Sequence, residues 1–429
     1  MADFVVVGGG VGGLVVAREL LLGGASVVLL EASDRLGGSV SRHEVGGLQL
    51  DAGAESFATR GGTVAALVSD LGLAGDIVTP NPAGAWLHPV SGRPVPLPKT
   101  SLLGIPGSPT AADVIAAIGG PSAWRARITD AVLPGSFAAD ASSLGELVRR
   151  RMGPAVLERL VTPIVRGVHA TEPSTLDVDR VAPGLRAAMR STGSLAGAVL
   201  QLRAAVPAGS AVAGIRGGIS RIVDELAADV ARLGADIRFG QRVTAVEPGR
   251  VTVGASPSST EVTGHVAVAA PGILQNDDEK AAAGDGHLAV LATLVLDDAR
   301  LDAAPRGSGV LVAAGAPGIR AKALTHATAK WQWLAEAAGG LHVVRLSYAS
   351  EHAEHAEVAR ADASALLGLE LEAGSVVDFA RVQWRRPALQ QHTPTGISLA
   401  GETASGTGLA SIVAHSRKLA ARLLQDFER

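Results

Sequence analysis

The sequence predicts an α/β protein whose first domain binds a dinucleotide, and three observations support this. Residues 4–20, FVVVGGGVGGLVVAREL, are a short apolar run that breaks into glycines and then takes a helical pattern. A second apolar strand is expected at 26–30 and ends in Glu31. Much later, the sequence predicts a glycine turn at 217–218, a helix at 219–233 and a strand near 237–239. This order indicates that the chain returns to the sheet of its first domain.

Length and composition limit the remaining choices. With 429 residues the chain is too long for one compact core, so we expect two or three domains. A hydrophobic share of 47% indicates a globular protein, and a net charge of −3 excludes a nucleic-acid partner. The absence of cysteine excludes disulfides, thiolate metal sites and a catalytic thiol. No basic segment precedes the first apolar run, which glycines soon interrupt, so a cytoplasmic location without a transmembrane segment is predicted.

The glycine turn has the pattern of a phosphate site. In G-x-G-x-x-G, Gly8 permits the tight turn, Gly10 lets the backbone approach a pyrophosphate, and Gly13 lets the helix pack on the strand. The positive end of the helix expected at 14–22 attracts the phosphate charge. Glu31 stands where an acidic residue binds the ribose hydroxyls. Strand, turn, helix and acid in this order predict a dinucleotide site.

The later chain adds strands and helices. Residues 251–255 and 265–271 predict strands that return to the first sheet. Residues 111–204 have mainly helical patterning, 288–348 predict short strands mixed with loops, and 409–427 predict a closing helix.

The residues after Glu31 indicate which dinucleotide is bound. The stretch EASDRLGGSVSRHEVGGLQLDAGAESF, residues 31–57, resembles the flavin-binding opening of the amine oxidase and protoporphyrinogen oxidase superfamily. The resemblance implies that Arg35 and the glycines after it run beside the pyrophosphate and that residues 53–56 face the isoalloxazine ring. GQRVTAVEPG, residues 240–249, is similar to the strand whose valine, here Val243, holds the adenine through its backbone. LAGETASGTGL, residues 399–409, resembles the last flavin motif, so FAD is the predicted cofactor.

The resemblance implies a set of FAD contacts from both ends of the chain. They are Gly8, Gly9, Gly10, Val11, Gly12, Gly13, Glu31, Ala32, Arg35, Gly38, Ser39, Gly53, Ala54, Glu55, Ser56, Val243, Trp384, Gly401, Glu402, Thr407, Gly408 and Leu409.

Segments in the middle of the chain indicate which branch of this superfamily the chain resembles. Residues 91–109 and 142–179 resemble stretches peculiar to porphyrinogen oxidases, and 322–333 and 382–388 are similar to later family segments. The nearest resemblance is to the Gram-positive branch, which oxidises coproporphyrinogen III to coproporphyrin III. It implies a Rossmann-type FAD domain from residues 1–60, 205–272 and 385–429. An interleaved α+β substrate domain from 61–110 and 273–384, and a helical subdomain from 111–204, complete the expected fold.

The implied chemistry is a six-electron oxidation in three rounds of hydride transfer to flavin N5, with O2 reoxidising the flavin and releasing H2O2. The protein has to hold the macrocycle against the flavin, and no metal, protein nucleophile or other catalytic residue is assigned. The resemblance implies the porphyrinogen and O2 as partners, and it allows hand-over of the product to other enzymes of haem synthesis. Peripheral contact with a membrane is left open.

Several tempting residues have two interpretations. Arg166 is predicted either to meet a substrate propionate or to face solvent, and His169, where a tyrosine is usual, either to touch substrate or to pack. Trp384 is expected near the flavin or in a structural role, and Lys330 with Trp331 in a cavity wall or in packing. The remaining candidates are expected to be solvated helix faces without a metal: the arginines at 149–151, and the Glu-His pairs at 351–352 and 354–355.

Alternative functions differ in class. Protoporphyrinogen IX is the nearest alternative substrate. A flavin amine oxidase is disfavoured because residues 385–426 contain no Phe, Trp or Tyr to form an aromatic pair beside the flavin. A non-catalytic relative that keeps the fold is disfavoured because the flavin motifs are intact.

Overall fold

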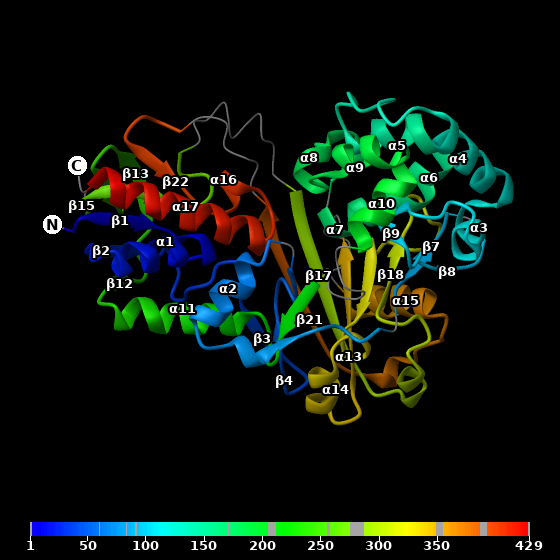
Figure 1. Ribbon diagram of the computed structural model, residues 1–429. Helices are drawn as coiled ribbons and strands as arrows, with labels where there is room; N and C mark the ends of the chain where they lie inside the picture. The colour runs from blue at the N-terminus through cyan, green and yellow to red at the C-terminus, as the bar shows by residue number, and fades with distance from the viewer. Residues whose placement is uncertain are drawn as a thin grey trace. The chain divides into compact units, whose positions relative to one another are not determined.

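The chain folds into two compact units. The computed structural model describes residues 2–59, 61–82, 84–90, 92–169, 171–204, 212–254, 258–274, 287–348, 355–386 and 393–427. Unit 1 consists of Met1–Thr79, Val212–Ala289 and Val382–Arg429, and unit 2 of Pro80–Ala211 and Val290–Arg381 (Figure 1). The α/β fold with discontinuous segments is therefore confirmed.

A five-stranded parallel sheet forms the centre of unit 1. Its order is β12 (Asp236–Arg238), β2 (Val27–Leu30), β1 (Phe4–Val7), β16 (His265–Val268) and β22 (Ile397–Leu399). Numbered by their succession in the chain, these strands read 3-2-1-4-5, which is the Rossmann arrangement. The order reverses between β1 and β16, and ligands of such sheets bind at the carboxyl ends of the strands at this point.

Each face of this sheet is covered by a different layer. Phe4, Val6 and Leu29 pack against three helices, and Val5 and Val7 pack against a three-stranded antiparallel sheet. The helices are α1 (Val11–Leu22), α11 (Ser220–Arg232) and α17 (Leu409–Phe427). The antiparallel strands are β13 (Val243–Glu247), β14 (Arg250–Val253) and β15 (Thr260–Thr263). The strand predicted at 265–271 joins the first sheet as β16, whereas the one predicted at 251–255 forms β14 of the antiparallel sheet, so its predicted return to the first sheet was wrong. The predicted closing helix has the observed bounds of α17. Among the described helices, none combines the length and apolarity needed to cross a bilayer.

The first helix differs from the prediction at its start. It begins at Val11, not at 14, because Gly10 is the extended residue before the first turn. A side chain at Gly13 would place its Cβ 2.0 Å from the Gly8 carbonyl oxygen, so Gly13 packs as part of the helix.

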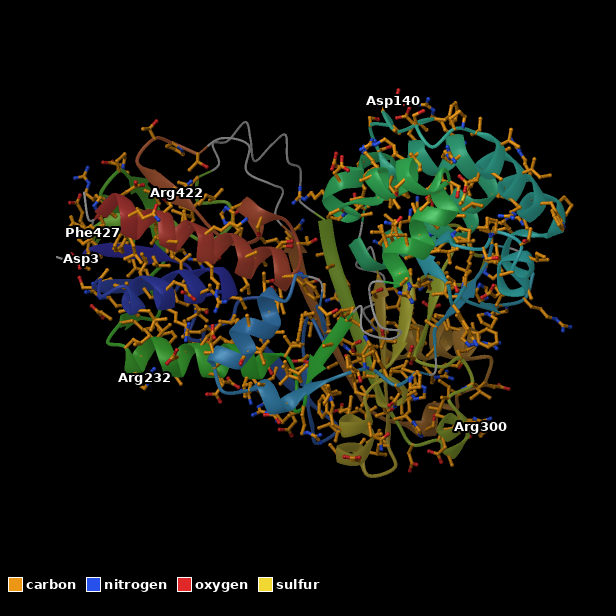
Figure 2. All side chains as sticks on the ribbon, viewed as in Figure 1. Asp3, Asp140, Arg232, Arg300, Arg422 and Phe427 are labelled. Atoms are coloured by element: carbon orange, nitrogen blue, oxygen red, sulfur yellow. The ribbon has the colours of Figure 1, made fainter. Side chains whose placement is uncertain are left out.

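Shorter elements complete unit 1, and the two ends of the chain meet in it. The Phe4 and Phe427 rings lie 5.3 Å apart, and Figure 2 shows Asp3 and Phe427 at one end of the sheet. The shorter elements are β3 (Arg42–Val45), β4 (Leu48–Asp51), β5 (Phe57–Ala58), α2 (Thr63–Asp70), a 3-10 turn (Ala74–Asp76), β6 (Ile77–Val78), β11 (Val212–Ile215) and α16 (Glu402–Ser405).

The unit boundaries differ from the predicted ones. Residues 61–79 belong to unit 1, because α2 buries Val64, Leu67 and Val68 in its core. The helical segment 111–204 shares unit 2 with residues 80–110 and 290–381. The substrate-binding role given to these segments stays a prediction.

A seven-stranded sheet organises unit 2. Its order is β21 (Val376–Arg386), β17 (His287–Leu296), β20 (His342–Tyr348), β19 (Ala323–His326), β18 (Gly309–Val312), β7 (Trp86–His88) and β8 (Val95–Pro96). The expectation of only short strands in 288–348 is wrong, since β17 has 10 residues and β20 has 7. Both strands lie inside the sheet, and most of their residues are buried.

Helices make up the rest of unit 2. Those beside the sheet are α13 (Ala327–Lys330), α14 (Gln332–Ala338) and α15 (Ala356–Leu367), with 3-10 turns at Ala299–Ala303 and Ala373–Ser375. A separate helical layer contains α3 (Ala112–Ile118), α4 (Gly120–Val132), α5 (Leu144–Met152), α6 (Pro154–Val156), a π-helical turn (Leu157–Val161), α7 (Thr162–His169), a 3-10 turn (Pro173–Thr175), α8 (Val178–Val181), α9 (Leu185–Thr192) and α10 (Leu195–Ala204). The hairpin of β9 (Ser101–Leu102) and β10 (Ile105–Pro106) packs against this layer.

Candidate functional site

The first glycine turn lies at the point where the strand order of the parallel sheet reverses. Gly8 has φ of +102°, and a Cβ there would lie 2.9 Å from the backbone nitrogen of Ala270, just after β16. The backbone of the turn is thus packed on the neighbouring strand. A Cβ on Gly10, by contrast, would have no other atom within 4 Å. The N-terminal amides of α1 have no side-chain cap and no acidic residue in the first turn, so the start of the helix can accept an anion.

Glu31 lies against this turn. Its Oε2 accepts a hydrogen bond of 2.7 Å from the Gly9 amide, and its Oε1 accepts bonds of 2.8 Å from the amide and hydroxyl of Ser33. The end of β2 therefore brings the predicted ribose-binding acid to the predicted phosphate turn. Its contact with ribose stays a prediction.

The second glycine loop runs beside the first. The Gly37 amide donates a hydrogen bond of 2.8 Å to the Gly9 carbonyl, and residues 10 and 37 form a parallel β-bridge. A Cβ on Gly38 would lie 3.5 Å from the Gly10 Cα. Two backbone segments without side chains thus border the open space at Gly10. Arg35 is exposed at this loop and donates a bond of 3.2 Å to the Gly38 carbonyl.

The segment expected at the flavin ring packs on the second loop. A Cβ on Gly53 would lie 2.2 Å from the Ser39 carbonyl oxygen, so no larger residue fits. Ala54 is exposed, and Glu55 and Ser56 are half-buried. Ala32 and Ser39 are exposed as well.

Asp51, just before this segment, is a residue that the sequence reasoning missed. Its carboxylate accepts hydrogen bonds from the amides of Ile219 (2.9 Å) and Ser220 (3.0 Å) at the start of α11. It lies under Gly218, where a Cβ would come within 2.9 Å of its Oδ1. Two features of the sequence could have indicated this contact: an acid shortly before the glycine segment at 53, and a Gly-Gly pair just before a predicted helix. Asp51 therefore positions residues 52–56 relative to α11.

The last predicted motif meets the first one. A Cβ on Gly12 would lie 2.6 Å from the Gly401 Cα, so the first turn of α1 touches the backbone just before α16. Gly401 and Gly408 have φ of +77° and +101°. Glu402 is half-buried, Thr407 is exposed, and Leu409 begins α17. Sequence positions about four hundred residues apart are thereby brought together in unit 1.

The other two predicted contacts of unit 1 lie on strands. Val243 begins β13, is buried, and pairs with Val253 on the sheet face opposite α1. Trp384 is half-buried on the last residues of β21, which belong to unit 1. Among the described contacts, none joins Trp384 to the glycine turns, so its place near the flavin stays a prediction.

The predicted substrate residues lie on one helix of unit 2. Arg166 on α7 donates to Glu172 at 2.6 Å, and about a third of its side chain is exposed. His169 is the last residue of α7, and its side chain lies outside the described part of the structure. The structure thus pairs Arg166 with a neighbouring acid.

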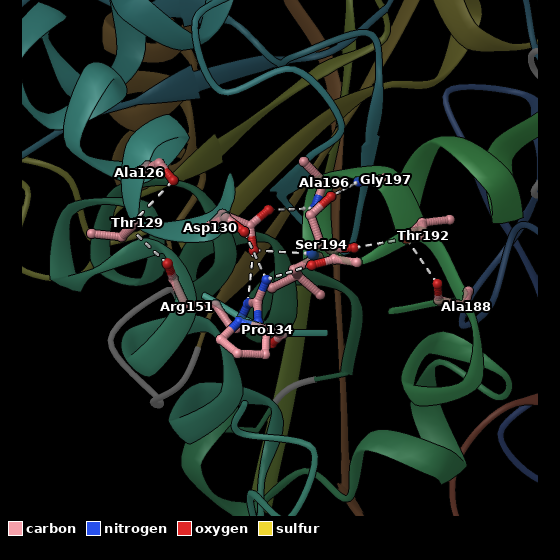
Figure 3. A network of polar contacts seen from close by, with 12 residues as sticks. Ala126, Thr129, Asp130, Pro134, Arg151, Ala188, Thr192, Ser194, Ala196 and Gly197 are labelled. Carbon is pink, nitrogen blue, oxygen red and sulfur yellow. Dashed lines mark hydrogen bonds and ion pairs between the residues drawn. The ribbon is translucent and has the colours of Figure 1, made fainter. Parts of the chain in front are cut away.

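The expectation that all of 149–151 is a solvated face is wrong for Arg151. Arg149 and Arg150 are exposed, but Arg151 is fully buried and donates to Asp130 Oδ1 at 2.8 Å and to the Pro134 carbonyl at 2.6 Å (Figure 3). The Asp130 carboxylate also accepts the amides of Leu195 and Ala196 at the start of α10. Three consecutive arginines read as a charged face, because the sequence does not show that the third turns inward.

Trp331 and the Glu-His pairs have structural explanations. Trp331 is 2% exposed, and the Lys330 ammonium lies 4.9 Å from its ring centre, so the tryptophan packs in unit 2. Residues 351–354 lie outside the described ranges, and His355 is exposed just before α15. Within those ranges, no group of three His, Asp or Glu side chains is arranged to hold a metal ion.

A buried histidine pair in unit 2 was not predicted. His326 Nε2 and His342 Nδ1 lie 3.2 Å apart, and His342 Nε2 lies 3.2 Å from Asp302 Oδ1. The three residues line a cavity of about 540 Å³. Burial, and next the neighbouring His342, lowers the pKa of His326 to about 4.

This pair predicts acid sensitivity. Because the pKa of His326 is about 6.5 in the unfolded chain and about 4 in the fold, the unfolded state binds the proton more tightly. The contribution of the neutral His326 to the free energy of unfolding is fully present above pH 6.5 and is lost as the pH falls towards 4. Between pH 7.5 and 5.0 we expect the free energy of unfolding to fall by about 2 kcal/mol because of this residue. Urea unfolding of the wild type and of His326→Gln checks it: an equal acid sensitivity of the two proteins would contradict this assignment.

The geometry of unit 1 fits FAD. Backbone segments without side chains border an open space at the start of an uncapped helix, as a pyrophosphate requires. The acid that would bind ribose touches the same turn, and the motif from the far end of the chain closes on it.

Comparisons with known proteins agree with this geometry. A model of the family "Flavin containing amine oxidoreductase" matches residues 11–277. Coproporphyrinogen III oxidase of Mycobacterium leprae (strain TN) is 31% identical over 96% of this chain and 93% of its own. Chloroplastic protoporphyrinogen oxidase of Oryza sativa subsp. japonica is 29% identical over 57% of this chain and 47% of its own.

Solved structures share the fold. A proposed protoporphyrinogen oxidase from Exiguobacterium sp. 255-15 superposes with a TM-score of 0.81 at 22% identity, covering 99% of this chain and 98% of its own. Cyclohexylamine oxidase of Brevibacterium oxydans IH-35A gives 0.64 at 17% identity over the whole of both chains. At these identities the likeness concerns the fold alone.

Proposed function

Because the chain belongs to the flavin-containing amine oxidoreductase family, and within it to the porphyrinogen oxidases, we propose that it oxidises coproporphyrinogen III to coproporphyrin III. It is an oxidoreductase with FAD as its cofactor. The observation that carries the choice of substrate is the extent of the similarity to the Mycobacterium leprae enzyme. It spans 96% of the chain and so includes unit 2 as well as the flavin-binding unit.

The role of the protein's own residues is to bind and orient the cofactor. The backbone around Gly10 and the start of α1 would hold the pyrophosphate, and Glu31, beside the Gly9 amide, would accept hydrogen bonds from the ribose hydroxyls. When bound, FAD would supply a hydride acceptor at N5 that O2 can reoxidise, and removal of six electrons from the porphyrinogen would correspond to three O2 reduced to three H2O2. No protein side chain has to act as nucleophile.

Arg166 and His169 remain the proposed substrate contacts. The guanidinium of Arg166 can bind a substrate propionate in place of Glu172, because both partners are carboxylates that accept from the same N–H group. The half-exposed position of this pair allows that exchange.

Amine oxidation is the second candidate and has less support. A putrescine oxidase and cyclohexylamine oxidase share the fold at 16% and 17% identity. The only tyrosine, Tyr348, is buried in β20 of unit 2, and 385–426 contain no aromatic residue.

An aerobic assay tests the proposal. Purified protein is expected to be yellow and to convert coproporphyrinogen III to a fluorescent porphyrin with three H2O2 for each product. Protoporphyrinogen IX and simple amines serve as competing substrates in parallel reactions. Porphyrin formation no faster than autoxidation would contradict the proposal, and peroxide formed only with amines would favour the second candidate.

A further inference from the structure

The helix that carries Arg166 contains a widened turn. Helical backbone runs without a break from α6 through the π-helical turn Leu157–Val161 into α7, since Val156 and Thr162 on its flanks have helical dihedral angles. A π-turn bonds residue i to i+5, so it holds one more residue than an α-helical turn. At about 100° per residue, the extra residue rotates every later position of the helix, including Arg166, by about 100° relative to an uninterrupted α-helix.

Two contacts explain why the helix is widened at this place. Pro163 is the second residue after the π-turn, and a proline inside a helix has no N–H to donate and a ring that collides with the carbonyl four residues earlier. The other contact comes from the hairpin of β9 and β10. A Cβ on Gly104, at the tip of this hairpin, would lie 2.6 Å from the Leu160 carbonyl oxygen and 2.8 Å from the Val161 Cα. The wider turn relieves both constraints.

The tip of the hairpin requires glycine at position 104. Leu103 and Gly104 join β9 to β10 with φ of +52° and +83°, the two positive angles of a two-residue hairpin turn. Gly104 is also buried, and it faces helix backbone, which cannot turn away as a side chain can. Ile105 fixes the hairpin, because it is fully buried in the same core as Leu160. A side chain at position 104 would therefore have to displace the helix.

The acidic partner of Arg166 is held by a different helix. Glu172 precedes the 3-10 turn Pro173–Thr175, and α5 packs on this turn, since a Cβ on Gly145 would lie 3.0 Å from the Pro173 carbonyl carbon. The 2.6 Å hydrogen bond from Arg166 to Glu172 thus joins two separately fixed segments. The direction of the Arg166 side chain therefore depends on the rotation of α7.

We propose that Gly104 is a positioning residue for Arg166. By admitting the hairpin to the π-turn, Gly104 sets the rotation of α7 and thus the direction in which the guanidinium meets a carboxylate ligand. The planar fork of a guanidinium binds a carboxylate through two parallel hydrogen bonds, so its direction matters more than that of a point charge. The inference rests on the proposed function, because the ligand carboxylate is a propionate of the porphyrinogen.

Binding of coproporphyrin III, the tetracarboxylate product, tests the proposal on the full-length protein with FAD. Gly104→Ala should raise the dissociation constant roughly tenfold in fluorescence titration, as should Arg166→Met, because each removes one charge-assisted contact. The KM for coproporphyrinogen III should rise by the same factor, while kcat and FAD content stay unchanged. In the Arg166→Met background, Gly104→Ala should add nothing, because both substitutions act through one contact.

Gly119→Ala is the matched control. Gly119 lies between α3 and α4 of the same helical layer and has the same φ of +83°, but a Cβ there would have no other atom within 4 Å. This variant should lose thermal stability through backbone strain alone and bind the porphyrin as the wild type does. Wild-type binding by Gly104→Ala, equal weakening by both glycine variants, or effects of Gly104→Ala and Arg166→Met that multiply would overturn the proposal.

A second variant reaches the same turn from the helix side and keeps the proposal testable if Gly104→Ala does not fold. Pro163→Ala restores the missing N–H and removes the ring, so that the turn narrows and α7 rotates. It should also weaken porphyrin binding, and wild-type binding would overturn the proposal. The binding assay separates this inference from the proposed function. A wild type that binds coproporphyrin III without oxidising the porphyrinogen would contradict the function alone, and a wild type that does neither would overturn both.

Discussion

Gly10→Val is expected to yield a folded, colourless protein that no longer binds FAD. Gly10 has φ of −70° and ψ of 174°, which valine adopts readily, and a Cβ there meets nothing within 4 Å. The new side chain instead fills the space that the pyrophosphate needs. We expect FAD affinity to fall by about 100-fold or more, or about 3 kcal/mol, in titration calorimetry of the apoprotein.

A second glycine provides the control. Gly75→Val also places its side chain in open space, in an exposed turn of unit 1, and should bind FAD as the wild type does. Gly13→Val is unsuitable, since its Cβ would strike the Gly8 carbonyl and disturb the fold. Unchanged FAD affinity of Gly10→Val, with the thermal midpoint of the wild-type apoprotein, would show that the pyrophosphate lies elsewhere.

The parts of this site that are local in sequence were predictable from the residues. A strand, a glycine turn, a helix and a second strand ending in Glu31 occupy one continuous stretch, so their spacing determines their geometry. The meeting of Gly12 with Gly401 was implied only by family resemblance. Nothing in either segment shows that the other lies beside it.

Pairs that arise from tertiary packing were not predictable. His326 and His342 meet because β19 and β20 pair antiparallel, so that the last residue of β19 lies beside the first residues of β20. Arg151 comes after two exposed arginines and is buried because its helix position faces α4 and α10. Charge in the sequence indicates exposure on average, and a buried ion pair is the exception.

Asp130→Asn is expected to destabilise the helical layer of unit 2 by about 3–5 kcal/mol, because it leaves the buried Arg151 without its counter-charge. The carboxylate accepts Arg151 and Leu195 at one oxygen and Ala196 at the other, whereas asparagine offers one acceptor and turns an NH2 donor towards these donors. Urea unfolding followed by circular dichroism measures the loss. FAD affinity should be unchanged below the transition, because the flavin residues lie in unit 1.

Asp140→Asn is the control, because it removes the same charge from an exposed ion pair in the same helical layer. Asp140 also pairs with an arginine, at 3.3 Å, but 79% of its side chain is exposed, and water replaces the lost contact. Its loss should cost less than about 1 kcal/mol. If the two substitutions destabilised the protein equally, the Asp130–Arg151 pair would not be the contact that joins α4, α5 and α10. A large loss for Asp130→Asn alone would show that this one carboxylate stabilises three helices by neutralising Arg151 and capping α10.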